Sequence, residues 1–293
     1  MPDATLAFIG GSGIYDIEGL ADRRDVDVPT PFGAPSDTIA LGTLGSTAVA
    51  FLPRHGRGHR LSPTEIPARA NIYALKALGV ERIVSLSAVG SLQEEIRPLD
   101  VLIPNQLIDR TKTRASTFFG EGIVAHVGFA DPFCPQMASV AACAATDSGA
   151  TTHPGGTYVV MEGPQFSTRA ESALYRSWGA SVIGMTALPE AKLAREAEIC
   201  YTTIALVTDY DCWRDGEESV SVELVVANLG RNVERSRSII RELARRIPAK
   251  RTCPCASALA NAIITNPDQV SPEAAARLSI IVNRYLKAPR EVV

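Results

Sequence analysis

The segment CYTTIALVTDYDCW, residues 200–213, is the most informative stretch of this chain. Residues 203–207 form an apolar run that predicts a buried strand, and the chain then continues into Asp209 and Asp211. Binding sites in α/β sheets lie where strands end, so these two carboxyls are candidates for such a site. They can accept hydrogen bonds from an amino group and donate a proton to a ring nitrogen, as an amino-purine leaving group requires. A helix cap or a loop ion pair would use the same residues.

Strand and helix patterns alternate along the chain. This alternation predicts an α/β fold with a twisted, mostly parallel or mixed sheet and helices on both faces. We expect one domain over residues 1–293, with a helical extension from about residue 250. Thr168 and Glu171 match a capping box at the start of one helix. The predicted strands cover residues 4–9, 46–51, 82–87, 101–109, 156–162, 182–185 and 200–208. The predicted helices cover residues 68–78, 136–146, 168–179, 189–198, 222–246, 257–264 and 272–286.

The composition is that of an ordinary globular protein, with 46% hydrophobic and 21% charged residues among 293. A net charge of −3 gives no reason to expect a nucleic acid or an anionic membrane as partner. No apolar segment approaches membrane-spanning length, and the first residues carry an acid where a signal peptide needs basic residues. We therefore expect a cytoplasmic location.

The cysteines do not show the spacing of a zinc site. The close pair Cys253 and Cys255 has no accompanying pair of histidines. In a reducing cytosol we expect free thiols rather than disulfides, an expectation that a thermophilic source would change. The other cysteines are Cys134, Cys143, Cys200 and Cys212.

Three predicted strand ends carry groups that bind anions. The GGSG motif at residues 10–13 offers backbone N–H groups and the Ser12 hydroxyl, without the spacing of a Walker A loop or a dinucleotide fingerprint. Arg54 and His55 follow a second strand, and an arginine fork matches phosphate oxygens. Ser87 ends a third strand. Each motif alone also fits a tight turn or an exposed loop, but together they predict one oxyanion pocket for phosphate.

Other predicted strand ends carry residues that suit a nucleoside. Phe166 can stack on a flat ring, the Met185 thioether can pack on a sugar, and the Thr186 hydroxyl can reach a phosphate. Core packing is the usual role of Phe and Met, so that alternative stays open.

Eight motifs follow one another along the chain: IGGSGIYD (9–16), TPFGAPSD (30–37), PRHGRGH (53–59), AVGSLQEEIRPLD (88–100), MEGPQFSTRAES (161–172), SWGASVIGMT (177–186), PEAKLAREA (189–197) and TDYDCW (208–213). On these motifs the chain resembles the 5′-methylthioadenosine phosphorylases of the purine nucleoside phosphorylase family, over about residues 5–250. The Cys253-Pro254-Cys255 element is similar to the Cys-x-Cys tail of some microbial members, in which disulfides occur.

The resemblance implies phosphate-dependent cleavage of the N-glycosidic bond of methylthioadenosine, giving adenine and 5-methylthioribose 1-phosphate. It implies a transition state similar to an oxocarbenium ion, so catalysis stabilises the leaving base and places an anion below C1′. The family's phosphate site falls on Ser12, Arg54, His55, Ser87, Ala88 and Thr186, with threonine in place of Ser87 in many relatives. The family's nucleoside site falls on Phe166, Ser167, Met185, Asp209, Asp211, Val222, Val225 and His126, the last contributed to a neighbouring subunit.

Asp209 is expected to decide base specificity. A carboxyl can donate to N7 and, with Asp211, serve the N6 amino group, whereas the related 6-oxopurine enzymes carry asparagine there. As the general acid, Asp209 needs a pKa raised by burial and by Asp211. Val222 and Val225 favour a methylthio group over a 5′-hydroxyl by about 1–2 kcal/mol.

The resemblance implies no metal or organic cofactor, with phosphate as co-substrate. It implies a homo-oligomer, either a trimer or a dimer of trimers. One alternative is a phosphorylase of 6-oxopurines or methylthioinosine, against which Asp209 speaks. A second is a methylthioadenosine hydrolase, which does not need Arg54 and His55. A third is a nucleoside-binding regulator without turnover, which would bind the ligand and form no product.

Overall fold

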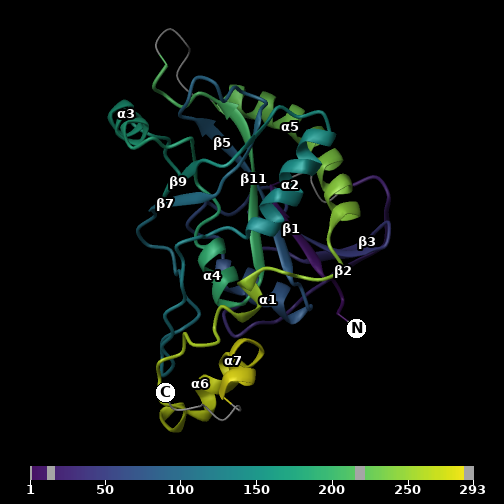
Figure 1. The fold of residues 1–293 in the computed structure, drawn as a ribbon, viewed down its shortest axis with the longest axis vertical. Helices are drawn as coiled ribbons and strands as arrows, with labels where there is room; N and C mark the ends of the chain where they lie inside the picture. The colour runs from purple at the N-terminus through teal and green to yellow at the C-terminus, as the bar shows by residue number, and fades with distance from the viewer. Residues whose placement is uncertain (1, 12–16, 215–221, 287–293) are drawn as a thin grey trace.

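The computed structural model describes residues 2–11, 17–214 and 222–286 (Figure 1). Within these residues eleven strands form one mixed sheet with helices on both faces, which confirms the predicted fold class. The strands are β1 (Leu6–Gly10), β2 (Leu20–Val26), β3 (Ile39–Leu44), β4 (Thr47–Pro53), β5 (Arg82–Ser91), β6 (Val101–Ile103), β7 (Gln106–Arg110), β8 (Thr152–Pro154), β9 (Thr157–Met161), β10 (Val182–Gly184) and β11 (Cys200–Asp209). The helices are α1 (Ala68–Ala77), α2 (Pro135–Asp147), α3 (Arg169–Ser177), α4 (Glu190–Glu196), α5 (Val222–Arg246), α6 (Pro272–Arg277) and α7 (Ser279–Leu286).

Strand β5 is the branch point of the sheet. It pairs in parallel with β1 and β11 and, near its end, antiparallel with β10. Strand β1 continues in parallel to β4, and β10 continues in parallel to β9. These pairings gather the ends of several strands around the last residues of β5. A binding site is expected at such a place in an α/β sheet.

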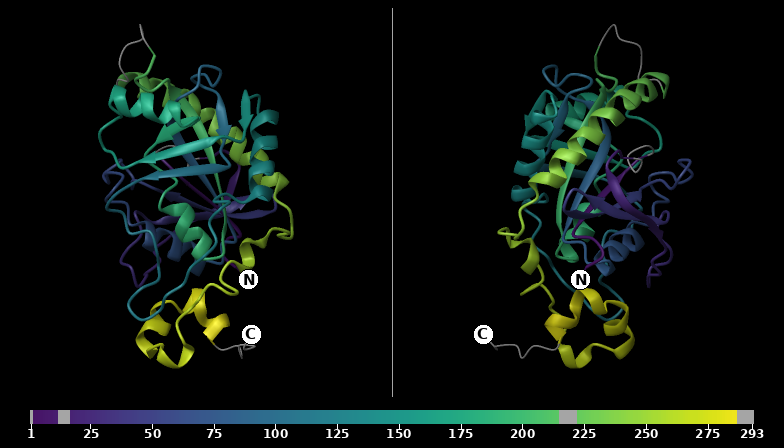
Figure 2. Two further views of the ribbon diagram at one scale, coloured as in Figure 1. Left: turned by 60° about the vertical axis from the view of Figure 1, so that its left-hand side comes forward. Right: turned by 90° about the vertical axis from the view of Figure 1, so that its right-hand side faces the viewer.

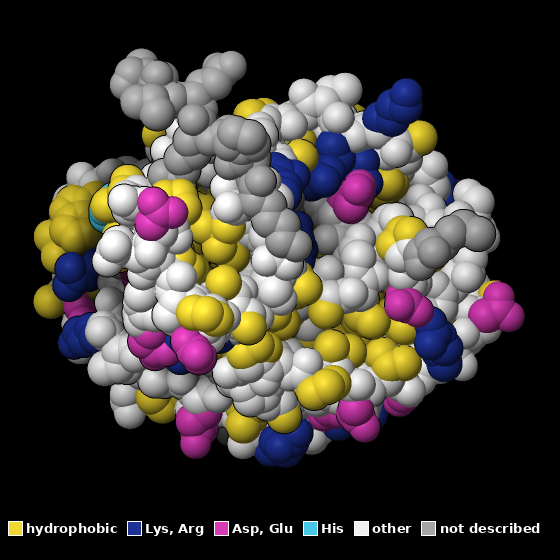
Figure 3. Space-filling view, turned by 90° about the horizontal axis from the view of Figure 1, so that it is seen from below, with side chains coloured by type: hydrophobic (Ala, Val, Ile, Leu, Met, Phe, Trp, Pro, Cys, Tyr) yellow, Lys and Arg dark blue, Asp and Glu magenta, His cyan; other side chains and the backbone are white. Residues whose placement is uncertain are grey.

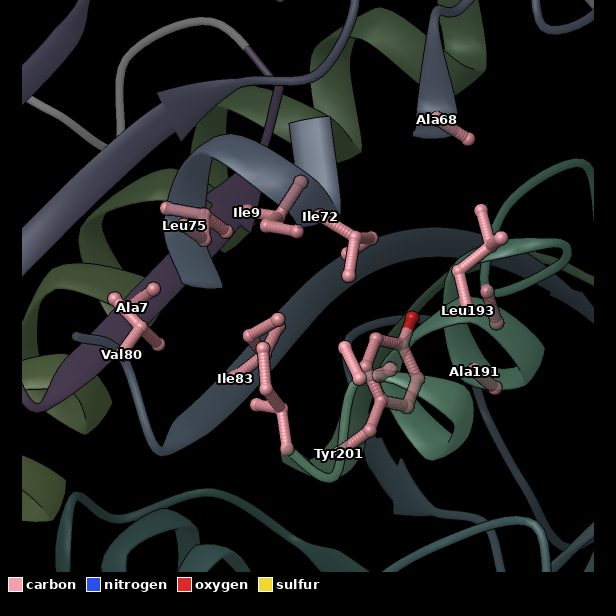
Figure 4. Packing of buried hydrophobic residues seen from close by; sticks show 14 of the residues in the cluster. Ala7, Ile9, Ala68, Ile72, Leu75, Val80, Ile83, Ala191, Leu193 and Tyr201 are labelled. Carbon is pink, nitrogen blue, oxygen red and sulfur yellow. The ribbon is translucent and has the colours of Figure 1, made fainter. Parts of the chain in front are cut away.

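The two faces of the sheet bury different helices. Alternate residues of β1 point to opposite faces, as the twofold period of a strand requires. Ala7 and Ile9 belong to the cluster with Ile72 of α1 and Leu193 of α4, and Figure 4 shows these side chains converging. Phe8 belongs to the cluster with residues of α2 and α5 on the other face (Figure 2). All ten residues of β11 are buried between the two layers.

Helix α3 begins as the sequence predicts. The Thr168 side chain accepts a hydrogen bond from the Glu171 N–H, and the Glu171 carboxylate accepts from the Thr168 N–H, so the capping box is confirmed. Helix α5 has the predicted bounds. The predicted strand at 101–109 is instead two strands, β6 and β7, because Pro104 and Asn105 interrupt the ladder.

The predicted helix at residues 257–264 is wrong. A short 3-10 helix, η1 (Pro254–Ser257), is followed by turns, and a second one, η2 (Pro267–Gln269), comes later. The backbone here bonds to another segment: the His126 N–H donates to Ala262 O, and Ala125 forms a bridge with Ile263. This pairing competes with helical hydrogen bonds that local sequence alone would favour.

Beyond η1 the chain leads to α6 and α7, which lie at the end of the molecule away from α3 (Figure 1). Figure 3 views the molecule from this end and shows hydrophobic side chains exposed there. Val124, Ile264 and Ile280 are large apolar residues of this region with exposed fractions of 44%, 60% and 39%, which suits an end that meets another surface. Among the described helices, none combines the length and the apolar character that crossing a bilayer requires.

Candidate active site

A cavity of about 370 Å³ lies at the strand ends gathered around β5. It is lined by nine of the residues that the sequence singles out, namely Arg54, His55, Ser87, Ala88, Phe166, Met185, Thr186, Asp209 and Asp211. Most of them follow or end β4, β9, β10 and β11. Ser87 and Ala88 instead lie within β5, which continues to Ser91, so the prediction that this strand ends at residue 87 is wrong. The antiparallel pairing of β10 with β5 brings Thr186 beside Ser87, so residues distant in sequence share one wall.

Arg54 is the best-anchored side chain of the cavity. It is 2% exposed, and its Nε donates to Glu190 Oε1 at 2.5 Å while Nη2 donates to Oε2 at 3.2 Å. Nη2 also donates to Ser85 Oγ at 2.5 Å, and Nη1 to the Leu86 carbonyl at 2.9 Å. Burial alone would lower the pKa of the guanidinium, but the charge and hydrogen bonds of Glu190 outweigh it and raise that pKa. Arg54 is therefore a fixed cation in the cavity wall.

Glu190, the partner of Arg54, is held by hydrogen bonds from Arg54 and Tyr201. Burial would raise the pKa of its carboxyl, but Arg54 beside it lowers that pKa below the ordinary value, so Glu190 is the anion of the pair. The Tyr201 hydroxyl on β11 also donates to Glu190 Oε2 at 2.9 Å. A buried ion pair such as Arg54–Glu190 loses the hydration of both charges, so it is stable only when close hydrogen bonds compensate for that loss.

His55 is neutral in this setting. Burial, with the nearby charge of Arg54, lowers the pKa of its imidazole to about 4. Nδ1 lies 2.8 Å from the Leu61 carbonyl, an acceptor, so Nδ1 carries the proton and Nε2 carries a lone pair. The ring stacks on His59 with 4.2 Å between centroids. His55 can thus accept a hydrogen bond from a hydroxyl of phosphate or sugar.

Hydroxyl groups form a chain along the same wall. Thr186 Oγ1 lies 2.7 Å from Ser87 Oγ, Ser85 Oγ lies 3.4 Å from Ser87 Oγ, and the Tyr158 hydroxyl lies 3.2 Å from Thr186 Oγ1. These groups rotate to donate or accept as a ligand requires. Next to a fixed cation they make a wall suited to an oxyanion.

The two carboxyls stand at the other strand end. Asp209 is 6% exposed; Oδ2 accepts from the Thr208 hydroxyl at 2.7 Å, and Oδ1 accepts from the Asp211 N–H at 2.8 Å. Burial raises the pKa of Asp209, and the charge of Asp211 adds to it. Burial also raises the pKa of Asp211. Both shifts favour a carboxyl that keeps a proton to donate.

A bulge aims Asp209 into the cavity. Val207 pairs with Val89 and Asp209 with Gly90, so β11 contains one residue more than β5 at this point. Gly90 gives the room: a Cβ there would lie 2.9 Å from Asp209 Oδ1 and 3.3 Å from the Asp211 backbone N. Asp211 has a φ of 51°, a left-handed conformation that aspartate tolerates better than most residues.

The apolar lining is partly open. Phe166 is 46% exposed and lines the cavity, so one ring face is available for stacking. Met185 packs against Gly163, where a Cβ would lie 2.5 Å from the Met185 Sδ. The Met185 thioether is thus fixed at the cavity wall by the absence of a side chain at position 163.

The chain is similar in sequence and in fold to known phosphorylases. The model of the phosphorylase superfamily matches residues 5–245. An S-methyl-5′-thioadenosine phosphorylase of Koribacter versatilis is 59% identical over 282 residues, covering 96% of this chain and 97% of that protein. That of Geobacter sulfurreducens is 58% identical, covering 97% of this chain and 100% of that protein. The chain belongs to the methylthioadenosine phosphorylase family.

Solved structures of this family agree. A methylthioadenosine phosphorylase from an antarctic soil metagenomic library has a TM-score of 0.92 and 50% identity, covering 96% of this chain and 99% of that one. A Schistosoma mansoni methylthioadenosine phosphorylase in complex with adenine has a TM-score of 0.80 and 34% identity, covering 96% of this chain and 98% of that one.

Some family positions are not in the cavity wall. Ser167 does not line it; its Oγ lies 3.8 Å from Met161 Sδ. His126 is exposed in the loop that contacts the tail, away from this chain's own cavity. Ser12 lies outside the described residues, and so do the side chains of Val222 and Val225 on α5.

Four residues in or behind the cavity wall are not identified by the sequence patterns. They are Glu190, Tyr201, Gly90 and His59. Glu190 lies in the PEAKLAREA motif and follows a proline, which marks only a helix start. Their roles arise from contacts between distant segments, so no local pattern shows them.

Proposed function

We propose that this chain cleaves S-methyl-5′-thioadenosine with phosphate, giving adenine and 5-methylthioribose 1-phosphate, as a pentosyltransferase of its family. The observation that carries the proposal is one cavity that combines a fixed cation with hydroxyls on one wall and two carboxyls, both with a pKa raised by burial, on a neighbouring strand end. Phosphorolysis needs both, because an anion must approach C1′ while negative charge develops on the leaving base.

Arg54 and the hydroxyls would hold the phosphate. Arg54 has five N–H groups, and those on Nε and Nη2 donate to protein acceptors. Its Nη1 donates to Leu86 O with one N–H, and we assign the other to a phosphate oxygen. Ser87, Thr186 and the Ala88 N–H complete the proposed set. His55 would accept a hydrogen bond at Nε2 from the hydroxyl of hydrogen phosphate, which orients the nucleophile while the imidazole stays neutral.

Asp209 would act on the base. In its protonated form it donates to N7, and the leaving adenine then departs as a neutral molecule. Asp211 would accept from the N6 amino group. Phe166 would stack on the purine and Met185 would pack on the ribose, with Ser167, Val222, Val225 and a neighbouring subunit's copy of position 126 completing the nucleoside site as predicted by the resemblance.

Product analysis tests this proposal. The purified chain is incubated with methylthioadenosine, with phosphate and after phosphate is removed enzymatically, and the products are separated by chromatography. Adenine that forms only with phosphate supports the phosphorylase. Adenine that forms equally without phosphate means a hydrolase, and the proposed role of Arg54 falls. Turnover of methylthioinosine in place of methylthioadenosine means that Asp209 selects a 6-oxopurine.

The activity fits purine and methionine salvage. We infer a homo-oligomer, trimer or dimer of trimers, because position 126 and the half-exposed Phe166 suit a site that a neighbouring copy completes. Sedimentation of the purified chain tests this: a monomer at micromolar concentration would contradict it. A cytoplasmic location and a reaction without metal or organic cofactor remain predictions.

A further inference from the structure

Four cysteines that are distant in sequence come together at the end of β11 opposite to Asp209. Cys200 begins β11, Cys134 directly precedes α2, and Cys253 and Cys255 lie in the segment after α5. Their sulfur atoms all lie within 4.8 Å of one another, and those of Cys200 and Cys253 are 3.3 Å apart. Spacing along the chain shows only the pair at 253 and 255, which is why the sequence predicts no zinc site.

We propose that these four cysteines bind one zinc ion as a structural site. Zinc bonds thiolate sulfur at about 2.3 Å, so the sulfurs of a tetrahedral site lie about 3.8 Å apart. The Cys200 and Cys253 sulfurs are 3.3 Å apart and no pair is more than 4.8 Å apart, so the cluster has the size that such a site requires. Four protein ligands fill the coordination shell and leave no position for substrate or water, which is the pattern of a structural rather than a catalytic zinc.

The surroundings suit a closed site. Cys134, Cys200 and Cys255 are buried in the apolar cluster that also contains residues of α2 and α5, and Cys253 packs against this cluster. An apolar shell excludes water and competing ligands. The cluster contributes four soft ligands of one kind, the set that thiophilic ions prefer over magnesium or calcium.

The charge of the site can be offset in part. Each thiol releases its proton to solvent as its sulfur bonds to zinc, so four protons leave and the site carries a net charge of −2. The thirteen-residue helix α2 begins at Pro135, directly after Cys134, so the positive end of its dipole lies next to the cluster. No oxidant is needed, whereas pairing the same thiols as disulfides would require one to remove two electrons for each bridge.

The ion would join the tail to the core. The segment that holds Cys253 and Cys255 connects α5 to α6 and α7 (Figures 1 and 2). Strand β11 spans about 30 Å between Cys200 and Asp209 at 3.3 Å per residue, so the ion would take no part in the reaction. Its effect would be to hold this connection, and through it the tail, in place.

Metal analysis of the full chain is the first test. The protein is produced with zinc in the medium, purified under reducing conditions and dialysed, and zinc is measured per chain. We expect about one ion per chain and, after replacement by cobalt, the intense thiolate-to-metal absorption of a tetrahedral site. Protein without zinc that does not take up cobalt overturns the proposal, whether thiol titration then finds free thiols or mass analysis finds disulfides.

Serine variants locate the ion. Cys134→Ser and Cys200→Ser should lose the zinc, while Cys143→Ser should keep it, because Cys143 lies on α2 but is exposed and outside the cluster. Zinc retained in full by both Cys134→Ser and Cys200→Ser would overturn this assignment. If these variants do not fold, the cobalt spectrum of the unmodified chain still decides. None of these readouts depends on the proposed function.

Discussion

The two ends of strand β11 lie in different surroundings, a polar cavity at one end and an apolar cluster at the other. At Asp209 the strand ends in a cavity, where buried carboxyls, a neutral imidazole and a guanidinium paired with a carboxylate lie close together. At Cys200 the strand starts in a dry apolar cluster, where four sulfurs stand close together and no water-lined cavity is needed. Strand β11 thus separates the polar groups of the cavity from the packed cysteines, and its ten buried residues run from one to the other.

Asp209→Asn should have the largest effect on catalytic activity. The amide cannot give up a proton as an acid, so kcat/KM for methylthioadenosine should fall about 10²–10⁴-fold. The relative rate with methylthioinosine should rise, because an amide can donate to O6 of a 6-oxopurine. Steady-state kinetics with both nucleosides measures this, and Asp211→Asn in parallel shows which carboxyl is the acid. An unchanged preference in Asp209→Asn would contradict the role of Asp209 in base selection.

Glu190→Gln should destabilise the fold as well as the site. It leaves the buried Arg54 guanidinium without its anion, a loss that typically costs about 3–5 kcal/mol. The loss should appear in the free energy of unfolding from urea titrations, together with a higher KM for phosphate. Glu95→Gln, which removes an exposed carboxylate in the same way, is the control and should leave both unchanged. Equal free energies of unfolding for the two variants would show that the Arg54–Glu190 ion pair does not stabilise the fold.

Acid should lower the stability of the folded chain through His55, which lies in the cavity wall. The folded imidazole has a pKa of about 4, below the ordinary 6.5, so the unfolded chain takes up a proton first as pH falls. Stability from this group is complete above pH 6.5 and is lost between pH 6.5 and about 4, by about 3 kcal/mol at most. His55→Asn should remove this part of the pH dependence. Unfolding midpoints of the unmodified chain and of His55→Asn are measured between pH 6.5 and 4. If His55 plays no part, the two midpoints will change with pH in the same way.

Gly90→Ala should be the mildest of these changes to stability and still reduce activity. The added Cβ would press on Asp209 Oδ1 and on the Asp211 backbone, and a displacement of a catalytic group by part of an ångström costs about 10–100-fold in rate. Gly128→Ala is a matched control, because a Cβ there meets no atom within 4 Å. Full activity of Gly90→Ala would mean that the strand yields and that Gly90 has no specific role.

Sequence patterns predict the parts of this molecule that local rules determine. The buried runs of β1 and β11, the capping box of α3 and the bounds of α5 are visible in the chain, and so are the strand ends that carry Arg54 and Asp209. Strand β2 is missed because its charged, largely exposed residues have no apolar alternation.

What the sequence hides is long-range geometry. The Arg54–Glu190 fork joins residues 136 positions apart, and the cysteine cluster joins three segments. The tail at residues 257–264 carries helical composition, yet its backbone pairs with residues 124–126. Such pairings are decided by tertiary contacts that composition does not contain.

The bulge between Val207 and Asp209 has a consequence for how this family changes over evolutionary time. Because side chains alternate from face to face, losing or gaining one residue at the bulge would turn Asp209 away from the substrate and toward a packed layer. A substitution here would change one side chain and leave the register intact, whereas deletion of one residue would displace the acid altogether. We therefore expect lineages to diverge at these positions in residue identity while the number of residues between the end of the apolar run and the acid stays constant.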